Sequence, residues 1–351
     1  MDLNGLRIGY VPYSGALNRP GDRRRFCYYA RKKNIPFEIA KPSETYDVVM
    51  VTAAADISVW SKYQKGKAKI VYDLIDSYLA IPQWDIKGLL RGFAKYVIGQ
   101  SSYLQLSYWK AVQEMCQRAD AVVCTTDEQK QDILRFCQNV HIILDIHNTV
   151  IHTVKRGYSA GDTFNFVWEG LPGNLRTFYE IRDVLERLKV KHKIALHIVT
   201  DLEYRQYMEQ YGKRNTIDLA RKVFHPVYLY EWNEQLCSTI ISACDMALIP
   251  IRLRDPIYVG KPENKLILFW RLGLPAVVSA TPAHERAMLQ CGLDMACRTQ
   301  QDWQETLERY IVDQSARQEA GERGKAFADT HYSEERILAR WDRLFTSVLS
   351  P

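Results

Sequence analysis

Short apolar runs alternate with longer amphipathic stretches along most of the chain. The short runs are rich in Val, Ile and Leu and are bounded by turn-forming residues, which is the pattern of β-strands. Because most of them lack polar alternation, we expect strands that are covered on both faces, as in parallel sheets. The predicted strands are Leu6–Tyr13, Val48–Thr52, Lys69–Ile75, Ala121–Thr125, Val140–Ile146, Phe164–Trp168, Ala195–Thr200, Val227–Tyr230, Met246–Ile251 and Pro275–Ser279.

The stretches between these strands show apolar positions at helical spacing, and three further helices follow one another near the end of the chain. Strands that alternate with crossover helices predict an α/β fold with two doubly wound, Rossmann-like domains. The predicted helices include Arg23–Lys33, Ile86–Arg118, Glu128–Cys137, Leu175–Lys189, Glu234–Cys244, Gln301–Asp313, Ala316–Thr330 and Glu334–Leu349.

One polar segment, His147–Asp162, interrupts the alternation and carries two glycines without sustained periodicity. Such a segment is typical of a linker between domains. We therefore expect an N-terminal domain over residues 1–152, a second domain over residues 153–330, and a terminal helix over residues 331–351.

Composition narrows the class of protein. The 351 residues are 47% hydrophobic and 25% charged, which is typical of a globular protein and leaves room for two domains. No apolar run approaches the roughly 18–20 residues that span a bilayer, and the first residues do not resemble an export signal. We therefore expect a cytoplasmic protein.

The net charge of +6 is concentrated in the first half, where residues 1–150 hold 20 Lys and Arg against 15 Asp and Glu. This excess is too small and dispersed for a nucleic-acid-binding protein. It suits an anionic substrate or membrane surface, and it suits a mildly basic soluble protein as well.

Eight cysteines are present, and none forms a C-x-x-C pair. Most lie in apolar runs, which favours buried thiols over disulfides or zinc ligands. We expect a reducing compartment, no structural metal and no metal ligands at the functional site.

Loops after strands are the first places to search, because ligands of open α/β sheets bind at the carboxyl ends of strands. The loop after the first strand runs from Ser14 and Gly15 to Asp22 and the arginines Arg23–Arg25. Asp22 is a candidate helix cap, and three arginines at a positive helix end favour an anionic partner. The alternative is a solvated loop with a basic first turn.

Two carboxylates, Asp73 and Asp76, stand three residues apart where the third predicted strand ends. A carboxylate at this edge can orient or deprotonate a substrate hydroxyl. The alternative is that one of them caps the next helix.

The second domain opens with a strand followed by a loop that contains Gly170, Asn174 and Arg176. With Asn174 as the cap of the next helix, backbone N–H groups there predict a cradle for a diphosphate. Many turns between a strand and a helix share this pattern.

A richer loop runs from Arg252 and Arg254 to Lys261 and Lys265. If Pro262 is the first residue of a helix, the two lysines lie four residues apart at its N-terminus, where like charge and the helix dipole oppose them. A phosphate between them would relieve this repulsion. The alternative is solvated lysines offset by Glu263.

Five segments, in chain order, resemble motifs of GT-B glycosyltransferases, especially the family 4 type. The donor-domain signature of that family resembles Lys261–Ser279, in which a Lys-rich helix start leads to a G-x-P-V-V-x-S strand. The other similar segments are Val71–Asp76, Ala119–Thr126, Trp168–Gly170 and Cys244–Pro250.

The resemblance implies two Rossmann-like domains that face each other across a cleft, with the acceptor in the first, a nucleotide-sugar in the second, and a final helix that returns to the first domain. Family 4 enzymes are retaining and need no bound metal. The Glu-x7-Glu pair of the family falls on Gly260 and Leu268 here. Neither side chain accepts a hydrogen bond, and Glu263, offset by three residues, could substitute only in a displaced loop. The resemblance therefore does not carry over the family's donor chemistry, ribose recognition or retaining outcome.

The sequence thus predicts a glycosyltransferase that moves a sugar from a nucleotide-sugar to a hydroxyl of a glycan or lipid-linked acceptor, as in surface polysaccharide or glycoconjugate biosynthesis. No cofactor besides the nucleotide-sugar co-substrate and no nucleic-acid partner are expected. The N-terminal domain, through Arg23–Arg25 and the aromatic segment Trp84–Trp109, is a candidate for peripheral contact with the inner face of a membrane.

The site residues share positions in the loops described above. Acceptor chemistry is assigned to Asp76 and Asp73, and acceptor binding to Ser14, Gly15, Arg23 and Arg24. Donor binding is assigned to Gly170, Asn174, Arg176, Arg252, Lys261, Glu263, Asn264 and Lys265. Two alternatives stay open: a non-catalytic GT-B-like partner protein, and a GT-B nucleotide-sugar epimerase.

Overall fold

The computed structural model describes residues 3–64, 66–81, 96, 99, 101–103, 107–206 and 211–350. The chain divides into two compact units, which are treated separately below. The first unit consists of Met1–Ile146, Gly260–Pro262 and Glu334–Pro351, and the second of His147–Val259 and Glu263–Ser333.

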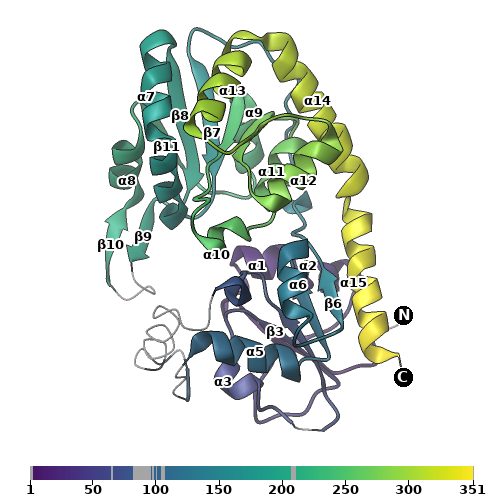
Figure 1. Cartoon of the computed structure of the whole chain (residues 1–351). Coiled ribbons are helices and arrows are strands. Elements are labelled where there is room, and N and C mark those ends of the chain that lie inside the picture. Colours follow the sequence, from purple (N-terminus) through teal and green to yellow (C-terminus); the bar gives the residue numbers. More distant parts are fainter. Residues whose placement is uncertain are drawn as a thin grey trace. The chain divides into compact units, whose positions relative to one another are not determined.

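The first unit contains a six-stranded sheet in the order β2-β1-β3-β4-β5-β6, in which every neighbouring pair is parallel. Its strands are β1 (Ile8–Val11), β2 (Glu38–Ile39), β3 (Val48–Thr52), β4 (Lys69–Asp73), β5 (Ala121–Cys124) and β6 (Val140–Ile142). The helices of this unit are α1 (Pro20–Arg24), α2 (Phe26–Lys32), α3 (Ile57–Trp60), α5 (Tyr108–Arg118), α6 (Asp127–Ile133) and α15 (Glu334–Leu349), with a short 3₁₀ helix η1 (Tyr78–Ala80). Figure 1 shows them flanking the sheet.

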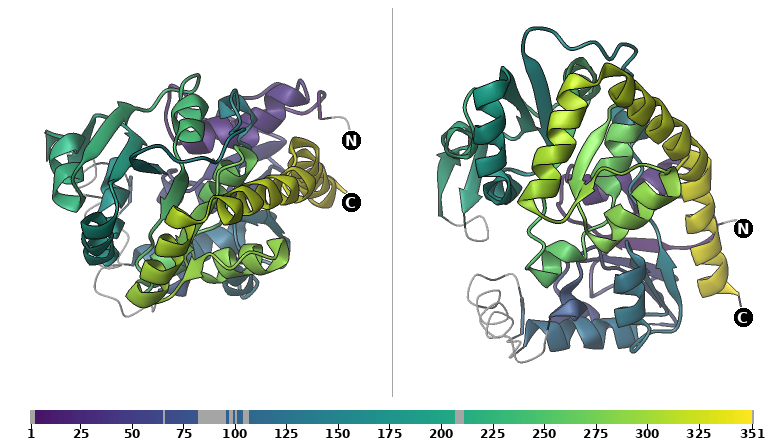
Figure 2. Two further views of the ribbon diagram at one scale, coloured as in Figure 1. Left: turned by 90° about the horizontal axis from the view of Figure 1, so that it is seen from above. Right: turned by 45° about the horizontal axis from the view of Figure 1, so that its top comes forward.

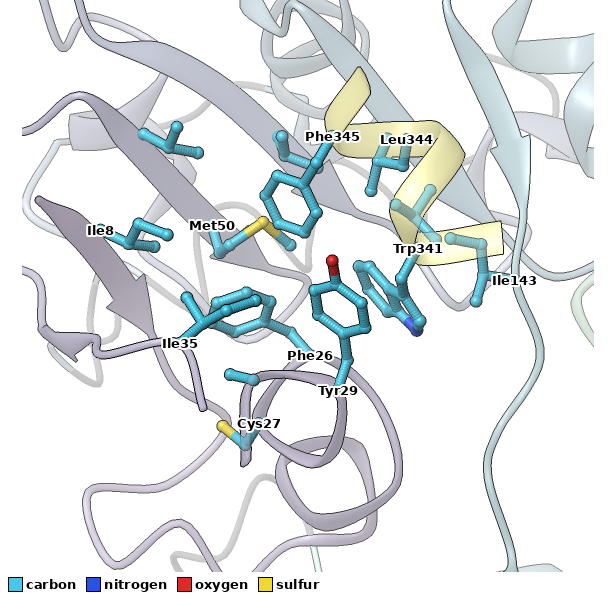
Figure 3. Close-up of a cluster of buried hydrophobic side chains, with 14 of the residues drawn as sticks. Ile8, Phe26, Cys27, Tyr29, Ile35, Met50, Ile143, Trp341, Leu344 and Phe345 are labelled. Carbon is cyan, nitrogen blue, oxygen red and sulfur yellow. The ribbon is translucent and has the colours of Figure 1, made fainter. Parts of the chain in front are cut away.

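The terminal helix α15 is part of the first unit's core. Its apolar side packs on α2 and the sheet, and Figure 3 shows Trp341 and Phe345 beside Phe26 and Tyr29. The Tyr29 ring stacks on Phe345 with centroids 5.5 Å apart and on Trp341 at 5.8 Å. Such aromatic pairs add to the free energy of burying their surface, so the first unit needs the end of the chain for a complete core.

The second unit contains another parallel six-stranded sheet, in the order β11-β8-β7-β12-β13-β14. Its strands are β7 (Phe164–Glu169), β8 (Ile194–Thr200), β11 (Val227–Glu231), β12 (Met246–Ile249), β13 (Ala276–Ser279) and β14 (Ala296–Cys297). A two-stranded antiparallel hairpin, β9 (Glu203–Gln206) and β10 (Tyr211–Asn215), follows β8.

Helices flank this second sheet, as the views in Figure 2 show. They are α7 (Arg182–Lys191), α8 (Thr216–Val223), α9 (Cys237–Ala243), α10 (Pro256–Val259), α11 (Asn264–Arg271), α12 (Pro282–Cys291), α13 (Gln300–Val312) and α14 (Gln314–His331), with the 3₁₀ helices η2 (Asn148–Val150) and η3 (Pro172–Glu180). The observed fold class is the predicted one, two Rossmann-like doubly wound domains.

All ten predicted strands are present, with shifts of a few residues at their ends. Four short strands were not predicted: β2 and β14 have two residues each, too few for a periodic signal, and the β9–β10 hairpin is polar. The predicted helix Arg23–Lys33 is interrupted at Arg25, whose φ of −124° and ψ of −125° separate α1 from α2. Of the predicted helix Ile86–Arg118, α5 is observed, and most of the part before Ser107 lies outside the described residues.

The predicted linker His147–Asp162 is ordered against the second unit. Tyr158 donates its hydroxyl to the Gly273 carbonyl at 2.7 Å, and the Arg317 guanidinium donates to the Tyr158 carbonyl. A Cβ on Gly321 would lie 2.5 Å from the Tyr158 ring, so a glycine is required where α14 passes this segment.

All eight cysteines are buried, as predicted, and none of these described residues is in a disulfide. The described part of the chain contains no helix that could span a bilayer. Within those same residues, no group of three or more His, Cys, Asp or Glu side chains is arranged to hold a metal ion.

Candidate functional site

The second sheet has a topological switch point beside its first strand. From β7 the chain proceeds to β8 on one side and later returns to β12 on the other. Ligands of open α/β sheets bind outside the carboxyl ends of the strands at such a point. The loops after β7 and β12 begin at this point, and both contain predicted donor-binding residues.

The loop after β7 is fixed by its backbone. Gly170 N–H donates to the Val199 carbonyl at 3.3 Å, and the Thr200 hydroxyl donates to the Gly170 carbonyl at 2.6 Å. The Lys265 ammonium, from the first turn of α11, lies 4.5 Å from the centre of the Trp168 ring. The structure thus brings predicted residues Gly170 and Lys265 together at the switch point.

Asn174 and Arg176 occupy a different setting from the predicted one. The helical turns begin at Pro172, with Leu171 in the cap position, and form the 3₁₀ helix η3. Asn174 therefore lies inside the element and does not cap it, which corrects that prediction. Its carbonyl accepts from the Thr177 hydroxyl at 2.8 Å, and Arg176 is exposed to solvent.

The start of α11 also corrects a prediction. The helix begins at Asn264, with Glu263 in the cap position, so Pro262 is not its first residue and Lys261 lies before it. Only Lys265 is in the first turn. The Glu263 carboxylate accepts from the Tyr332 hydroxyl at 3.3 Å.

The two arginines after β12 share one acidic partner. Arg252 Nε lies 3.4 Å from Glu180 Oε1, and Arg254 Nη2 lies 3.9 Å from Glu180 Oε2. Glu180 is the last residue of η3. The carboxylate offsets part of the positive charge that the sequence placed in this loop.

Two buried side chains behind this loop, Ser279 and His284, are not among the predicted site residues. The Ser279 hydroxyl accepts from the Ile251 N–H at 2.8 Å and donates to the Ile251 carbonyl at 3.1 Å, which joins the ends of β12 and β13. His284, near the start of α12, is buried, with Nδ1 2.9 Å from the Ser279 carbonyl. Burial, partly opposed by this hydrogen bond and reinforced by the charge of Lys265, lowers the pKa of His284 to about 4, so the ring is neutral at pH 7. A histidine a few residues after a strand is the only sequence signal.

In the first unit, Asp22 organises the loop after β1. It is fully buried, and its carboxylate accepts from the N–H groups of Tyr13 and Ser14 and from the Tyr10 hydroxyl. The helix α1 begins at Pro20 with Arg19 as its cap residue, so Asp22 is not the cap that the sequence suggested.

The predicted acceptor-binding residues of this loop differ in exposure. The Ser14 hydroxyl donates to Asn18 Oδ1 at 2.9 Å, and Gly15 is exposed with open space around its Cα. Arg23 is half-buried and Arg24 is buried.

Asp73 forms a buried ion pair with Arg25. The Arg25 guanidinium donates to both of its carboxylate oxygens and lies 3.1 Å from Asp145 Oδ1, and Arg25 and Asp73 are both buried. This geometry does not support the predicted acceptor chemistry of Asp73. It also removes Arg25 from the basic run that was expected to attract an anion.

Asp76 keeps an accessible carboxylate, with a side chain 36% exposed. The Tyr78 hydroxyl donates to Asp76 Oδ2 at 3.3 Å, and Lys261 Nζ, which belongs to the same unit, lies 3.8 Å from Asp76 Oδ1. The predicted donor-binding residue Lys261 is thus paired with the predicted acceptor residue.

A buried glutamine holds the Asp76 loop in place. Gln129 Nε2 donates to the carbonyls of Leu74 and Asp76 at 2.6 and 3.1 Å, while its Oε1 accepts from the Thr125 N–H at 3.0 Å. Gln129 joins the loop after β4 to the loop after β5. No sequence pattern indicates this role, because a glutamine inside a polar helix resembles a solvated residue.

The aromatic segment Trp84–Trp109 lies largely outside the described residues, Trp84 included. Of its described members, Tyr108 and Trp109 are buried and pack on Tyr78. Tyr103 is 55% exposed, with Lys62 Nζ 4.4 Å from its ring centre.

No protein-family model matches the sequence, and no curated protein matches it. Solved structures do match. HepE of Anabaena, in complex with UDP and glucose, has a TM-score of 0.63 at 11% identity, over 97% of this chain and all of its own. A glycosyltransferase from Rickettsia africae has a TM-score of 0.60 at 10% identity, over 98% of both chains.

TarM matches with a TM-score of 0.58 at 13% identity, over 85% of this chain, which spans about half (54%) of the TarM chain. A mutant S. aureus TarM was determined in complex with fondaparinux, α-GlcNAc-glycerol and UDP. At these identities the likeness concerns the fold. The chain has the fold of the GT-B glycosyltransferases, with two Rossmann-like domains.

Proposed function

We propose that the protein is a glycosyltransferase that moves a sugar from a nucleotide-sugar donor to a hydroxyl of a glycan or lipid-linked acceptor, in the synthesis of a surface polysaccharide or glycoconjugate. The observation that carries the proposal is the Lys265 ammonium at the switch point, above the Trp168 ring and beside Gly170. The complexes of HepE with UDP and glucose and of TarM with UDP support it.

The chemistry follows from the charge that moves in the reaction. The bond between the sugar C1 and the phosphate oxygen breaks, the electron pair leaves with the nucleoside diphosphate, and the acceptor oxygen bonds to C1. A fixed cation near the departing phosphate stabilises this change more than it stabilises the ground state. Lys265 and the N–H groups after β7 would supply this stabilisation, with Arg252, which lies 3.4 Å from Glu180 at the end of η3, as a further cation.

We assign the acceptor hydroxyl to Asp76, the one of the two predicted carboxylates whose side chain is accessible. A carboxylate there would orient the hydroxyl and take its proton. Lys261 Nζ, 3.8 Å from Asp76 Oδ1, would help to hold that carboxylate in place. Asn174, Arg176, Glu263 and Asn264 stay proposed donor contacts, and Ser14, Gly15, Arg23 and Arg24 stay proposed acceptor contacts.

We propose that the reaction needs neither a bound metal nor a cofactor besides the nucleotide-sugar. The positive charge that a cation would bring to the diphosphate is supplied by Lys265 and Arg252 from the chain itself. Transfer that continues unchanged in excess EDTA would agree with this proposal, and transfer that stops and returns with Mg²⁺ would contradict it.

The test of the main proposal is titration calorimetry with UDP, ADP, GDP and CDP, followed by a transfer assay with the matching nucleotide-sugars. We expect one nucleoside diphosphate to bind and Lys265→Ala to weaken it by about ten-fold or more, as for the loss of a charge-assisted contact. Lys222→Ala, an exposed lysine of α8, is the matched control. If no nucleotide binds the wild type, the proposal fails.

Two other functions predict different results from the same assays. A non-catalytic partner protein would bind a nucleotide and never transfer a sugar. This alternative is favoured by Gly260 and Leu268, which occupy the family's two Glu positions. A nucleotide-sugar epimerase would convert the donor in the absence of any acceptor. Fold alone does not separate these functions.

We further propose that the first unit contacts an anionic membrane surface. Residues 62–110 hold eight Lys and Arg against three Asp and Glu, nearly the whole net charge of the chain. Lys62, Lys67 and Lys110 are exposed, and Lys62 lies on the exposed Tyr103 ring. Each lysine near an anionic surface contributes about 1 kcal/mol to the free energy of binding. The fraction of protein that sediments with phosphatidylglycerol vesicles should therefore fall in a Lys62→Glu/Lys67→Glu variant. An equal fall with phosphatidylcholine vesicles would contradict the proposal.

A further inference from the structure

Lys265 stands where a lysine is electrostatically unfavourable. It is the second residue of α11, so its charge lies near the positive end of the helix dipole. A cation there destabilises the helix when nothing compensates it. The position therefore calls for groups that hold the ammonium against this cost.

The ring of Trp168 is one such group. Lys265 Nζ lies 4.5 Å from the ring centre, and Trp168 is only 1% exposed. A cation–π contact with a tryptophan stabilises an ammonium, and it does so more strongly where the ring is shielded from water. Trp168 also packs edge-on against the buried Phe178 ring, with centroids 6.1 Å apart, so the surface under the ammonium is rigid.

The missing side chain of Gly170 is the second requirement. A Cβ at this position would lie 2.1 Å from Lys265 Nζ and 2.9 Å from the Trp168 ring. The backbone cannot yield easily, because Gly170 is hydrogen-bonded through both its N–H and its carbonyl to the end of β8. Gly170 thus leaves the volume that the ammonium occupies.

From this geometry we propose that Trp168 and Gly170 are positioning residues that set the Lys265 ammonium, before substrate arrives, at the place where the diphosphate of the donor binds. The inference rests on the proposed function and adds to it the device that orients its main cation. Neither residue touches the reacting atoms; both act through Lys265. A preset cation avoids the rotamer entropy that a free lysine loses on binding.

The test uses inorganic pyrophosphate, which is common to all nucleoside diphosphates, together with whichever nucleotide binds the wild type. Affinities of the full-length chain are measured by calorimetry for Trp168→Leu, Gly170→Ala and Lys265→Ala, and for each of the first two combined with Lys265→Ala. We expect each single substitution to weaken pyrophosphate by about five- to thirty-fold, the range that a 1–2 kcal/mol contact gives. Adding Trp168→Leu or Gly170→Ala to Lys265→Ala should change nothing further.

Three variants separate positioning from structure. Trp168→Phe keeps an aromatic face and should retain most of the affinity. Trp303→Leu removes another buried tryptophan, in α13, and should lower the urea midpoint without changing the dissociation constant of pyrophosphate. Gly170→Ala crowds the Lys265 side chain and the Trp168 ring at a φ of +157° that strains an alanine, whereas Trp168→Leu removes the ring, so urea midpoints are measured for both and either variant keeps the test decisive if the other does not fold.

The outcomes distinguish this inference from the proposed function. If wild type binds nucleotide but the losses from Trp168→Leu and Gly170→Ala add in full to that of Lys265→Ala, the two residues do not act through the lysine and the inference is wrong. If Trp168→Leu lowers stability with unchanged pyrophosphate affinity, its role is structural and the inference is again wrong. If wild type binds neither pyrophosphate nor any nucleotide, the proposed function fails together with it.

Discussion

Arg25 donates from Nε and Nη2 to the two carboxylate oxygens of Asp73, at 2.8 and 2.6 Å, in the interior of the first unit. The bidentate pair joins the break between α1 and α2 to the end of β4. Arg25 Nη1 also donates to the Ile143 carbonyl at 2.9 Å, so the guanidinium connects the end of β6 as well. Two charges that are buried together stabilise the fold only as long as both are present.

Asp73→Asn should therefore destabilise the protein by about 3–5 kcal/mol, because it leaves the Arg25 charge buried with a weakened partner. The measurement is urea denaturation followed by circular dichroism. Lys33→Gln, which breaks the exposed Lys33–Asp342 pair, is the matched control and should cost less than about 1 kcal/mol. If Asp73→Asn left the stability unchanged and abolished transfer, Asp73 would again be a candidate for acceptor chemistry.

Asp76→Asn should act on transfer and not on donor binding. Removal of a general base lowers kcat by about 10²–10⁴-fold, whereas the dissociation constant of the nucleoside diphosphate should stay unchanged. Transfer is measured at saturating acceptor, with Asp132→Asn, a half-buried carboxylate of α6, as the control. An unchanged kcat in Asp76→Asn would remove the residue from the proposed mechanism.

Gln129→Glu tests whether the Asp76 loop must be held in place. The substitution keeps the acceptor for the Thr125 N–H and replaces the donor to the Leu74 and Asp76 carbonyls with an oxygen. We expect a loss of about 1–3 kcal/mol in stability, because buried carbonyls lose their donor, and a higher KM for the acceptor.

Gln138→Glu is its control, since Gln138 donates to a single carbonyl at an exposed position. A change in the KM of the donor alone, with the KM of the acceptor preserved, would contradict the assignment of the Asp76 loop to the acceptor.

His284 should make the stability of the protein pH-dependent. Its pKa is lowered from 6.5 to about 4 in the folded chain, chiefly by burial. Between these values the unfolded chain binds a proton that the folded chain does not, so the free energy of unfolding falls as the pH falls from about 6.5 to 4. The shift corresponds to a loss on the order of 3 kcal/mol by the lower end of that window.

His284→Gln should flatten this dependence when urea midpoints are compared at pH 7 and pH 4.5. The control is His152→Gln, an exposed residue whose substitution should leave the dependence of the wild type. An equally steep loss in His284→Gln would assign the effect to other groups.

The apolar runs were sufficient to predict the fold class, because a strand buried on both faces must be continuously apolar wherever it lies in the sheet. Runs such as Val48–Thr52 and Ala121–Cys124 were identified to within a residue for this reason. The two-residue strands β2 and β14 carry too few positions for any pattern. Their pairing depends on the neighbouring strand, which the sequence does not place.

The candidate site shows the same difference between local sequence patterns and contacts made in the folded chain. The sequence alone determined that charged and glycine-rich loops follow β1, β4, β7 and β12, since strand ends and loop composition are local properties. Which of these charges pair within the protein depends on the folded chain. Asp73 pairs with Arg25, Arg252 and Arg254 share Glu180, Lys265 lies beside Gly170, and Lys261 pairs with Asp76. The physical reason is that a charge is neutralised by whatever lies within a few ångströms of it, and residues 48 positions apart, as Arg25 and Asp73 are, become neighbours only when the sheet forms.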